Sequence, residues 1–389
     1  MSKFHSYLNS ASSIIREYNG EIPLSGFLKN YFKEHKKFGS QDRKEVSSLT
    51  FQYYRLGYIA DDLPVEEKIL AADFICREQT SKVILNLKPE WLIIDQPNNQ
   101  MARIEITGLK WAENIHTPWL KLLSPEINPN PYVLSFLSQP DLFIRIRPGK
   151  KQKVLSSLEA VQHPCEELEP DCLRLANNVK LDEFLTINRD VVVQDVNSSK
   201  CGQVIKEHLP EIRGLVWDTC AASGGKSILM HDLFGKNIKL MVSDIRPTIM
   251  QNLKNRFAEA GVSPFHLFLA DLTQPINSKG IPWADVALID APCTGSGTWA
   301  RTPEQHHFFN PSKVEEYAER QIRICANVLT RLKPGGHIIY ITCSVFKAEN
   351  EQVLENLVTR QNLSLVHWQY LPGTALNADS MFIAILQKD

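Results

Sequence analysis

The stretch Leu215–Ser227, which reads LVWDTCAASGGKS, decides the fold of the C-terminal half of the chain. Leu215–Asp218 predicts a short buried strand, and Lys226–Phe234 predicts the helix that follows it. The small residues between them let a ligand approach the backbone beside the free N–H groups of a helix N-terminus. This order is typical of a parallel α/β sheet that holds a nucleotide-like ligand at its carboxyl edge.

Strands and helices continue to alternate after this loop, which predicts a parallel α/β domain. A capping box of Ser312 and Glu315 predicts the start of a long helix, and Pro334-Gly335-Gly336 predicts its end. The other predicted elements are strands at Ile238–Asp244, Phe265–Asp271, Val286–Asp290 and His337–Thr342, and a helix at Pro247–Ala260.

The first 110 residues predict helices instead. After Ser40, the apolar residues Val46, Leu49, Tyr53 and Leu56 recur three or four apart, as on one face of a helix. Residues 1–60 hold nine Lys and Arg against five Asp and Glu, so the simplest interpretation is a bundle with a solvated, mildly basic face. Residues 115–140 are rich in proline and predict a connector with at most short helices.

A basic cluster follows the connector. Leu142–Arg147 alternates basic with apolar residues and predicts a strand, and two hypotheses fit its charges: contacts to phosphate, or a solvated edge strand protected by cations. The cluster comprises Arg145, Arg147, Lys150, Lys151 and Lys153.

Composition limits the class of protein. The 389 residues are 43% hydrophobic and 22% charged, which indicates a globular protein of two or three domains. The formal charge of -1 excludes a globally basic protein, so a nucleic-acid surface must come from local clusters. Eight cysteines without zinc-ligand spacing, and no leader or membrane segment, predict a cytoplasmic protein of a reducing compartment with no metal site.

Four acids end four successive predicted strands: Asp218, Asp244, Asp271 and Asp290. Two ligand classes compete for this edge. Gly225-Lys226-Ser227 matches the end of a Walker A loop, but that motif needs glycine where the chain has Cys220. Because the acids would repel a triphosphate and can accept from hydroxyl and amino groups, they favour S-adenosylmethionine.

Two cysteines follow predicted strands at the same edge. Cys293 lies in Asp290–Gly297, DAPCTGSG, and Cys343 lies in Thr342–Ser344, TCS. A single strand-end cysteine is more often a small buried hydrophobe than a nucleophile. A pair of them at the ligand edge, one shortly after a strand-end acid, indicates chemistry.

These motifs resemble those of the RNA cytosine-C5 methyltransferases of the NOL1/NOP2/Sun family, especially its RsmB-like bacterial rRNA enzymes. The resemblance covers about residues 190–389, and it is weaker before that, where it rests on Gly39–Arg43, Arg55 and Leu142–Pro148. In the core the matching segments are Val193–Asp195, Asp218–Lys226, Asp290–Gly295, Arg301 with Pro303-Glu304, Thr342–Ser344 with Glu349-Asn350, and Asp379–Leu386. Ser223 replaces the family's usual proline, Thr294 its serine, and Asn197–Ser199 its alanine-serine.

The resemblance implies a fold and a domain order. Residues 206–389 are expected to form a Rossmann-like class I methyltransferase domain with a mixed seven-stranded sheet. Residues 1–110 are expected to form a helical RNA-binding domain, and 111–205 a connector with a small α/β RNA-binding region. The implied cofactor is S-adenosylmethionine, and the residues expected to bind it are Cys220, Ala221, Ala222, Ser223, Gly224, Gly225, Lys226, Asp244, Asp271 and Asp290.

The resemblance also implies a reaction. Cys343 would attack C6 of cytosine, Asp290 would contact the ring and stabilise the developing charge, and Cys293 would assist release of the product. The implied partner is RNA, rRNA of the small subunit first and tRNA as the alternative. The sequence carries no sign of oligomerisation, so a monomer is the default expectation. A P-loop-like NTPase and a non-catalytic RNA-binding protein are the other hypotheses, and His306-His307 are interpreted as surface residues or RNA contacts.

Overall fold

The computed structural model describes residues 2–92, 99–109, 111, 117–276 and 280–389. The chain forms two compact units. The helical unit comprises residues 1–121, 128–139 and 298–311, and the sheet unit comprises residues 122–127, 140–297 and 312–389. The expected start of the connector, at residues 115 and 116, lies outside the described residues.

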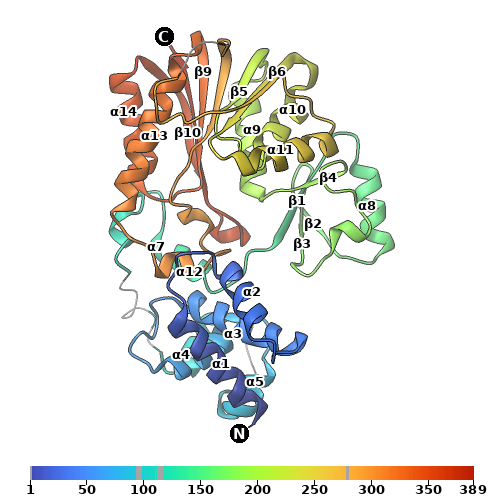
Figure 1. Ribbon diagram of the computed structural model, residues 1–389, viewed down its shortest axis with the longest axis vertical. Coiled ribbons are helices and arrows are strands. Elements are labelled where there is room, and N and C mark those ends of the chain that lie inside the picture. Colours follow the sequence, from blue (N-terminus) through green and yellow to red (C-terminus); the bar gives the residue numbers. More distant parts are fainter. Residues whose placement is uncertain (1, 93–98, 110, 112–116, 277–279) are drawn as a thin grey trace. The chain divides into compact units, whose positions relative to one another are not determined.

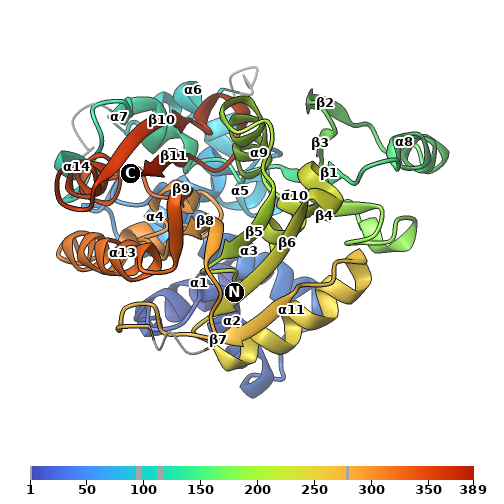
Figure 2. The ribbon, with the colours of Figure 1, turned by 90° about the horizontal axis from the view of Figure 1, so that it is seen from above.

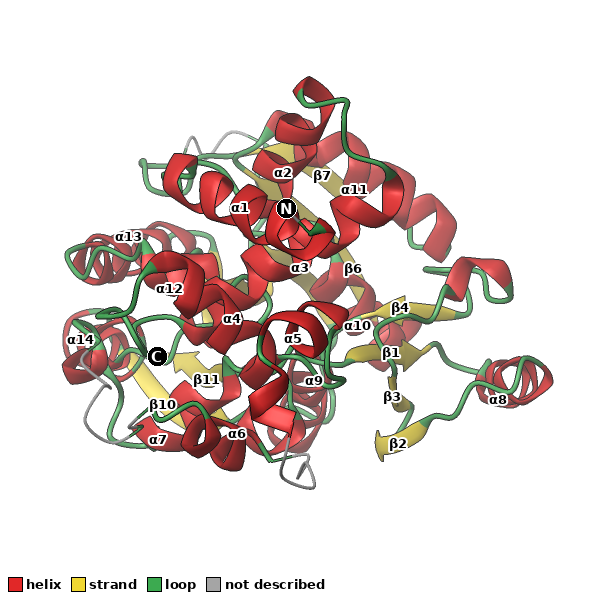
Figure 3. Ribbon diagram, turned by 90° about the horizontal axis from the view of Figure 1, so that it is seen from below, coloured by secondary structure: helices red, strands yellow, loops and turns green. Residues whose placement is uncertain are grey.

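The helical unit confirms the prediction for the N-terminal part. Its helices pack around one apolar core, and the helix expected after Ser40 is present as α3 (Figures 1 and 3). The elements are α1 (Lys3–Glu17), α2 (Leu24–Glu34), α3 (Ser40–Leu56), α4 (Val65–Cys76), α5 (Lys82–Leu87), α6 (Gln100–Ile106), α7 (Pro129–Ser135) and α12 (Glu304–His307), with 3-10 turns at Pro89–Leu92 and Leu120–Leu122.

Arg55 joins three distant segments of the helical unit. Its side chain is buried, and its Nη1 donates to the carbonyl oxygens of Phe136 at 3.2 Å, Ser138 at 2.9 Å and Ala300 at 2.7 Å. Burial lowers the pKa of Arg55 to about 10, which leaves the guanidinium charged at neutral pH. Segment 298–311, which follows the Cys293 loop in sequence, is thereby built into the helical core.

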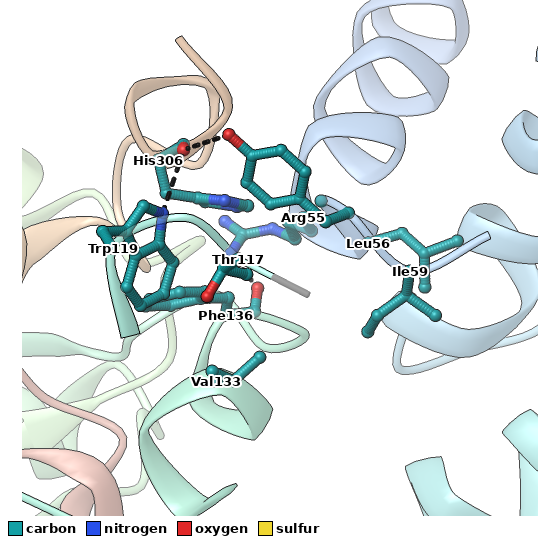
Figure 4. Close-up of a pocket in the computed structure, with 10 residues that line it drawn as sticks. Arg55, Leu56, Ile59, Thr117, Trp119, Val133, Phe136 and His306 are labelled. Carbon is teal, nitrogen blue, oxygen red and sulfur yellow. Dashed lines mark hydrogen bonds between the residues drawn. The ribbon is translucent and has the colours of Figure 1, made fainter. Parts of the chain in front are cut away.

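His306 lies in that core, so its interpretation as a surface residue or RNA contact is wrong. It is 2% exposed and lines, with Arg55, Trp119 and Phe136, a cavity of about 10 Å³ (Figure 4). Its ring occupies the space that a Cβ at Gly57 would need, where φ is +60°. Burial lowers the pKa of His306 to about 3, so the ring is neutral.

A four-stranded antiparallel sheet opens the sheet unit. Its order is β2-β3-β1-β4, and α8 (Lys151–Ala160) follows β1. The strands are β1 (Leu142–Ile146), β2 (Glu166–Glu169), β3 (Cys172–Leu175) and β4 (Val191–Val193), and a 3-10 turn covers Leu181–Glu183.

The structure contradicts both hypotheses for two members of the basic cluster. Arg145 and Arg147 are buried and share the carboxylate of Asp232, at 2.6 and 2.7 Å, and β1 lies inside its sheet rather than at an edge. A pair of buried arginines held by one aspartate cannot contact phosphate or protect an edge. Lys151 and Lys153 also have ion-pair partners, Glu167 and Asp190.

The second sheet confirms the expected mixed seven-stranded architecture. Its order is β10-β11-β9-β8-β5-β6-β7, and all neighbours in the run from β9 to β7 are parallel, while β11 runs antiparallel to both of its neighbours. The strands are β5 (Gly214–Asp218), β6 (Ile238–Asp244), β7 (His266–Leu269), β8 (Ala284–Asp290), β9 (Leu332–Thr342), β10 (Leu363–Leu371) and β11 (Met381–Lys388).

Helices cover both faces of this sheet (Figure 2). One core contains Val216 with residues of α9 (Val196–His208), α10 (Gly225–Phe234) and α11 (Pro247–Ala260). The next residue, Trp217, belongs to the other core, with α13 (Lys313–Leu329) and α14 (Glu351–Arg360). Successive side chains of a strand point to opposite faces of the sheet, and both faces are buried here. The strands are therefore apolar at nearly every position. Short 3-10 turns lie at Gly235–Asn237, Ser296–Thr298, Lys347–Glu349 and Thr374–Leu376.

Two details of the long helix differ from expectation. Ser312 makes no capping hydrogen bond to α13, because its φ of -62° and ψ of -21° are already helical rather than extended. The helix ends at Leu329, and Pro334-Gly335-Gly336 lies within β9, not at the end of the helix.

Replacing Arg55 with Met should destabilise the helical unit. The variant keeps an apolar side chain but leaves buried carbonyl groups without their donor, so we expect the free energy of unfolding to fall by about 3 kcal/mol. Urea unfolding followed by tryptophan fluorescence measures this change. Lys44→Ala, at an exposed position of the same helix, is the control and should shift stability by less than about 0.5 kcal/mol. Equal midpoints for Arg55→Met and the control would contradict the role of Arg55.

Candidate active site

The strand order reverses between β5 and β8, because the chain builds outward from β5 to β7 and then returns to the other side of β5. Ligands of such sheets bind outside the carboxyl ends of the strands at this switch point. Asp218 ends β5 and Asp290 ends β8, so both predicted acids lie there. Asp244 ends the neighbouring strand β6.

The loop after β5 is shaped for close approach. Ala222 and Gly224 have φ values of +46° and +82°, and the Ala222 N–H donates to Oδ2 of Asp244 at 2.9 Å. A Cβ added at Gly225 would meet no atom closer than 3.9 Å, the side-chain nitrogen of Gln194. Open space therefore adjoins the first turn of α10, whose N–H groups have no partner within the helix.

Lys226 supplies a buried positive charge at this edge. It is 6% exposed, and its Nζ donates to Oγ of Ser198 at 2.9 Å and lies 3.4 Å from Oδ2 of Asp290. Burial alone would lower the pKa of Lys226, but the charge of Asp290 and its hydrogen bond to the ammonium act in the opposite direction, and the pKa is raised. The ammonium is therefore a permanent part of the site.

Asp218 is fully buried beside this cation. Its Oδ2 accepts from Ser227 Oγ at 2.6 Å, and its Oδ1 has no partner among the described residues. Burial raises the pKa of Asp218 to about 7, against the hydrogen bond from Ser227. A buried carboxylate with an unused oxygen is costly to keep charged.

Asp244 and Asp271 differ in their surroundings. Burial would raise the pKa of Asp244, but hydrogen bonds from the side chain and N–H of Arg246 and from Ala222 lower it overall. Arg246 holds both carboxylate oxygens, at 2.9 and 3.0 Å, a contact that sequence reasoning missed. Asp271 lies two residues beyond β7, is exposed, and accepts from the N–H and hydroxyl of Thr273.

The polar groups of this edge fit an adenosyl ligand. Lys226 lies beside Asp290 and Arg246 is paired with Asp244, so each of these carboxylates has a cation next to it. Carboxylate oxygens can accept hydrogen bonds from the hydroxyl and amino groups of such a ligand. The predicted cofactor residues Cys220–Lys226, Asp244 and Asp290 lie together at this edge, whereas Asp271 lies two residues beyond β7.

Two serines beside the loop accept hydrogen bonds from neighbouring side chains. Ser223 accepts from Nη1 of Arg256 through its hydroxyl at 2.8 Å and its carbonyl at 3.0 Å. Ser198 accepts from Lys226 and also from Nε2 of Gln194 at 3.0 Å. Sequence reasoning missed Arg256 and the role of Ser198, because only the fold brings them to the loop.

Cys293 and Cys343 lie together, as their strand-end positions predicted. Their Sγ atoms are 3.3 Å apart, and both side chains are partly buried. The hydrogen bond with Cys343 raises the pKa of Cys293 well above its usual range, and burial and the charges of Cys343 and Glu349 add to this. Cys293 is therefore a neutral thiol at neutral pH, held against a second sulfur.

Cys220 is different in kind. Burial raises the pKa of its thiol to about 12, so it is a small apolar wall of the loop and not a nucleophile.

No helix in the described part of the chain is long and apolar enough to cross a membrane. The same residues hold no cluster of three or more His, Cys, Asp or Glu side chains arranged for a metal ion.

Comparison with known proteins gives a family. Residues 208–387 match the family described as 16S rRNA methyltransferase RsmB/F. A probable ribosomal RNA small subunit methyltransferase B of Synechocystis sp. is 28% identical over 166 residues, 43% of this chain and 36% of the relative. One of Coxiella burnetii is 30% identical over 189 residues, 45% of this chain and 44% of the relative. The matched part thus spans less than half of each relative.

Solved structures share the fold. The crystal structure of PH0851 superposes with a TM-score of 0.71 at 20% identity and covers 98% of both chains. The crystal structure of NSun6 from Pyrococcus horikoshii with SFG, an S-adenosylmethionine analogue, has a TM-score of 0.57 at 15% identity. It covers 67% of this chain and 94% of that one.

The buried carboxyl group of Asp218 predicts a pH dependence of stability. Its folded pKa of about 7 lies above the unfolded value of about 3.9, so the folded state binds the proton more tightly. Stability is therefore lost as pH rises from about 4 to about 7. Relative to wild type, the unfolding free energy of cofactor-free Asp218→Asn should rise by roughly 2 kcal/mol between about pH 5 and about pH 8. Urea unfolding at both pH values measures it, and a difference independent of pH would contradict it.

The strand order, the acidic edge with its buried lysine and the paired thiols agree with the sequence match. They confirm the resemblance stated from the motifs, and the hydrogen-bond acceptors of the edge fit the expected cofactor. Residues 208–387 of this chain match the RsmB/F family of 16S rRNA methyltransferases, and their cofactor is S-adenosylmethionine.

Proposed function

We propose that this protein methylates C5 of a cytosine in RNA through a covalent adduct with Cys343. The observation that carries the proposal is the 3.3 Å approach of the Cys343 and Cys293 sulfurs at the edge where the predicted cofactor residues lie. Cytosine C5 is a poor nucleophile by itself, so a thiol that adds to C6 is a chemical requirement for the reaction.

The proposed reaction forms and breaks bonds in the following order. Attack by the Cys343 thiolate forms an S–C6 bond and moves the electron pair of the C5–C6 double bond toward C5. The bound cofactor supplies a methyl group on a positively charged sulfur, which C5 accepts. Water then takes the C5 proton, the electron pair of the C5–H bond re-forms the C5–C6 double bond, and the S–C6 bond breaks to release the Cys343 thiolate.

Asp290 and Cys293 take the supporting roles. Lys226 lies near one oxygen of Asp290. The Asp290 side chain is 34% exposed, so Asp290 remains accessible to a cytosine ring whose charge develops during the attack. Cys293 keeps its proton because the pKa of its thiol is raised. Its S–H can therefore donate to the departing sulfur of Cys343.

We propose ribosomal RNA of the small subunit as the substrate. The support is the family that residues 208–387 match, together with the names of the relatives that match part of the chain. The RNA surface is proposed on the helical unit, since Arg145 and Arg147 are occupied by Asp232. Its candidates are exposed cations that make no ion pair with a described residue: Lys29, Lys33, Lys36, Lys37, Arg43 and Lys44.

Cys343→Ala should bind the cofactor normally but transfer no methyl group to RNA, because the S–C6 bond cannot form. Cys293→Ala should accumulate a covalent complex with RNA, since release is slowed. Labelled methyl transfer to unmethylated small-subunit rRNA, nucleoside analysis and denaturing gels measure these outcomes, and a thermal shift with S-adenosylmethionine controls for binding. Methylation by Cys343→Ala, or labelled nucleosides other than 5-methylcytidine, would contradict the reaction. Label in tRNA alone would contradict the substrate.

Replacing Lys33, Lys36 and Lys37 together with Gln should raise the KM for RNA severalfold and lower the salt dependence of binding by about two to three charges, because phosphate contacts release counterions. Cofactor affinity should not change. Filter binding over a range of salt concentrations measures the slope. Lys236→Gln, an exposed position of the sheet unit, is the matched control, and equal slopes for both variants would exclude this surface.

A further inference from the structure

Glu349 is a buried carboxylate with no role in the reaction as written above. It ends a 3-10 turn directly before α14 and is 0% exposed. It accepts from the N–H of Thr294 at 2.8 Å, the hydroxyl of Thr294 at 2.6 Å, Nε2 of Gln321 at 3.1 Å and the hydroxyl of Ser344. Both of its oxygens therefore point at donors.

The partners of Glu349 include the neighbours of both thiols. Thr294 follows Cys293 and Ser344 follows Cys343, so one carboxylate bonds to the residue after each cysteine. These two residues lie 50 positions apart, on loops after different strands. A hydrogen bond to each loop is a direct constraint on the distance between the sulfurs.

Other hydrogen bonds join the same two loops and also hold the two cysteines close together. The N–H of Val345 donates to Oγ of Ser296 at 2.9 Å, and the N–H of Gly297 donates to the carbonyl of Cys343 at 2.8 Å. Asn350, next to Glu349, accepts from Thr342 Oγ1 at 2.6 Å and donates to the Ser344 carbonyl at 2.9 Å. Thr342 and Ser344 flank Cys343, so the turn after β9 is fixed on both sides of the thiol.

Burying a carboxylate here is expensive, and a neutral apolar residue would fill the space at lower cost. Burial raises the pKa of Glu349 overall, although the hydrogen bonds from Ser344 and Thr294 lower it in part. What this side chain offers, and an apolar residue does not, is hydrogen-bond acceptors for donors on two loops.

We propose that Glu349 is the positioning residue that holds Cys293 and Cys343 at reacting distance. The effect of Glu349 on catalysis rests on the two-thiol reaction proposed above. The effect of Glu349 on the distance between the two sulfurs does not depend on that reaction. Glu349 does not touch the RNA base or the cofactor in this role, and it acts through Thr294 and Ser344.

The distance between the sulfurs can be measured without RNA or cofactor. Diamide oxidises two neighbouring thiols to a disulfide and is itself reduced to the hydrazine, taking both protons and both electrons. Peptide mapping by mass spectrometry then follows the Cys293–Cys343 disulfide over time in the full chain. The variants are Glu349→Ala, which removes the acceptor, and Glu349→Gln, which keeps one oxygen and an amide that can donate to the two hydroxyl groups.

We expect Glu349→Ala to form this disulfide at least about tenfold more slowly than wild type, and Glu349→Gln to recover most of the rate. Methyl transfer should fall in kcat for Glu349→Ala with little change in the KM for RNA. Glu355→Ala, at an exposed position of α14, should match wild type in both measurements. If Glu349→Ala does not fold, Thr294→Val deletes one hydroxyl of the set and should slow disulfide formation without changing the fold.

A folded Glu349→Ala protein that forms the disulfide at the wild-type rate would overturn the proposal. So would a Glu349→Gln protein as slow as Glu349→Ala, because the charge and not the loop geometry would then be responsible. If wild type transfers no methyl group to any RNA while Glu349→Ala still slows the disulfide, the proposed function fails and the positioning role stands.

Discussion

The acids at the cofactor edge depend on the positive charge of one buried side chain, the ammonium group of Lys226. Parallel strands bring Asp218, Asp244 and Asp290 to one edge, and carboxylates gathered without a cation would repel one another. Lys226 comes from the first turn of α10, lies near Asp290 after β8 and donates to Ser198 of α9. One charge thus joins the loop, the neighbouring strand and the preceding helix, while Arg246 pairs with Asp244 on the other side of the edge.

The sequence predicted the parts of this molecule that depend on local pattern. The strands at Ile238–Asp244 and Val286–Asp290, the loop between β5 and α10 and the meeting of Cys293 with Cys343 follow from apolar runs and from the edge that parallel strands share. Interactions between distant residues could not be predicted. Arg145 and Arg147 suggested an open basic surface, because nothing near them in sequence indicates that Asp232 neutralises both. A single sequence shows the charge of a residue but not its partner.

Positions where the chain departs from the usual family motifs are occupied by hydrogen-bonding side chains. Ser223 accepts from Arg256, Ser198 accepts from Lys226, and Thr294 donates to Glu349. Ser223 adds a hydroxyl group where proline is usual, whereas Thr294 keeps the hydroxyl group of the usual serine. Asn197 acts through its amide, which donates to the carbonyl oxygens of Leu371 and Asp379.

Segment 298–311 has a consequence for how the protein is made. The helical unit contains residues 1–121 and 128–139, yet it also includes this segment, whose Ala300 carbonyl accepts from Arg55 and whose His306 fills its core. On the ribosome, the helices emerge long before that segment is synthesised. Their core therefore stays incomplete, with a buried arginine short of an acceptor, until most of the sheet unit has been translated. The helical unit is synthesised first, but it cannot complete its core until most of the sheet unit has also been synthesised.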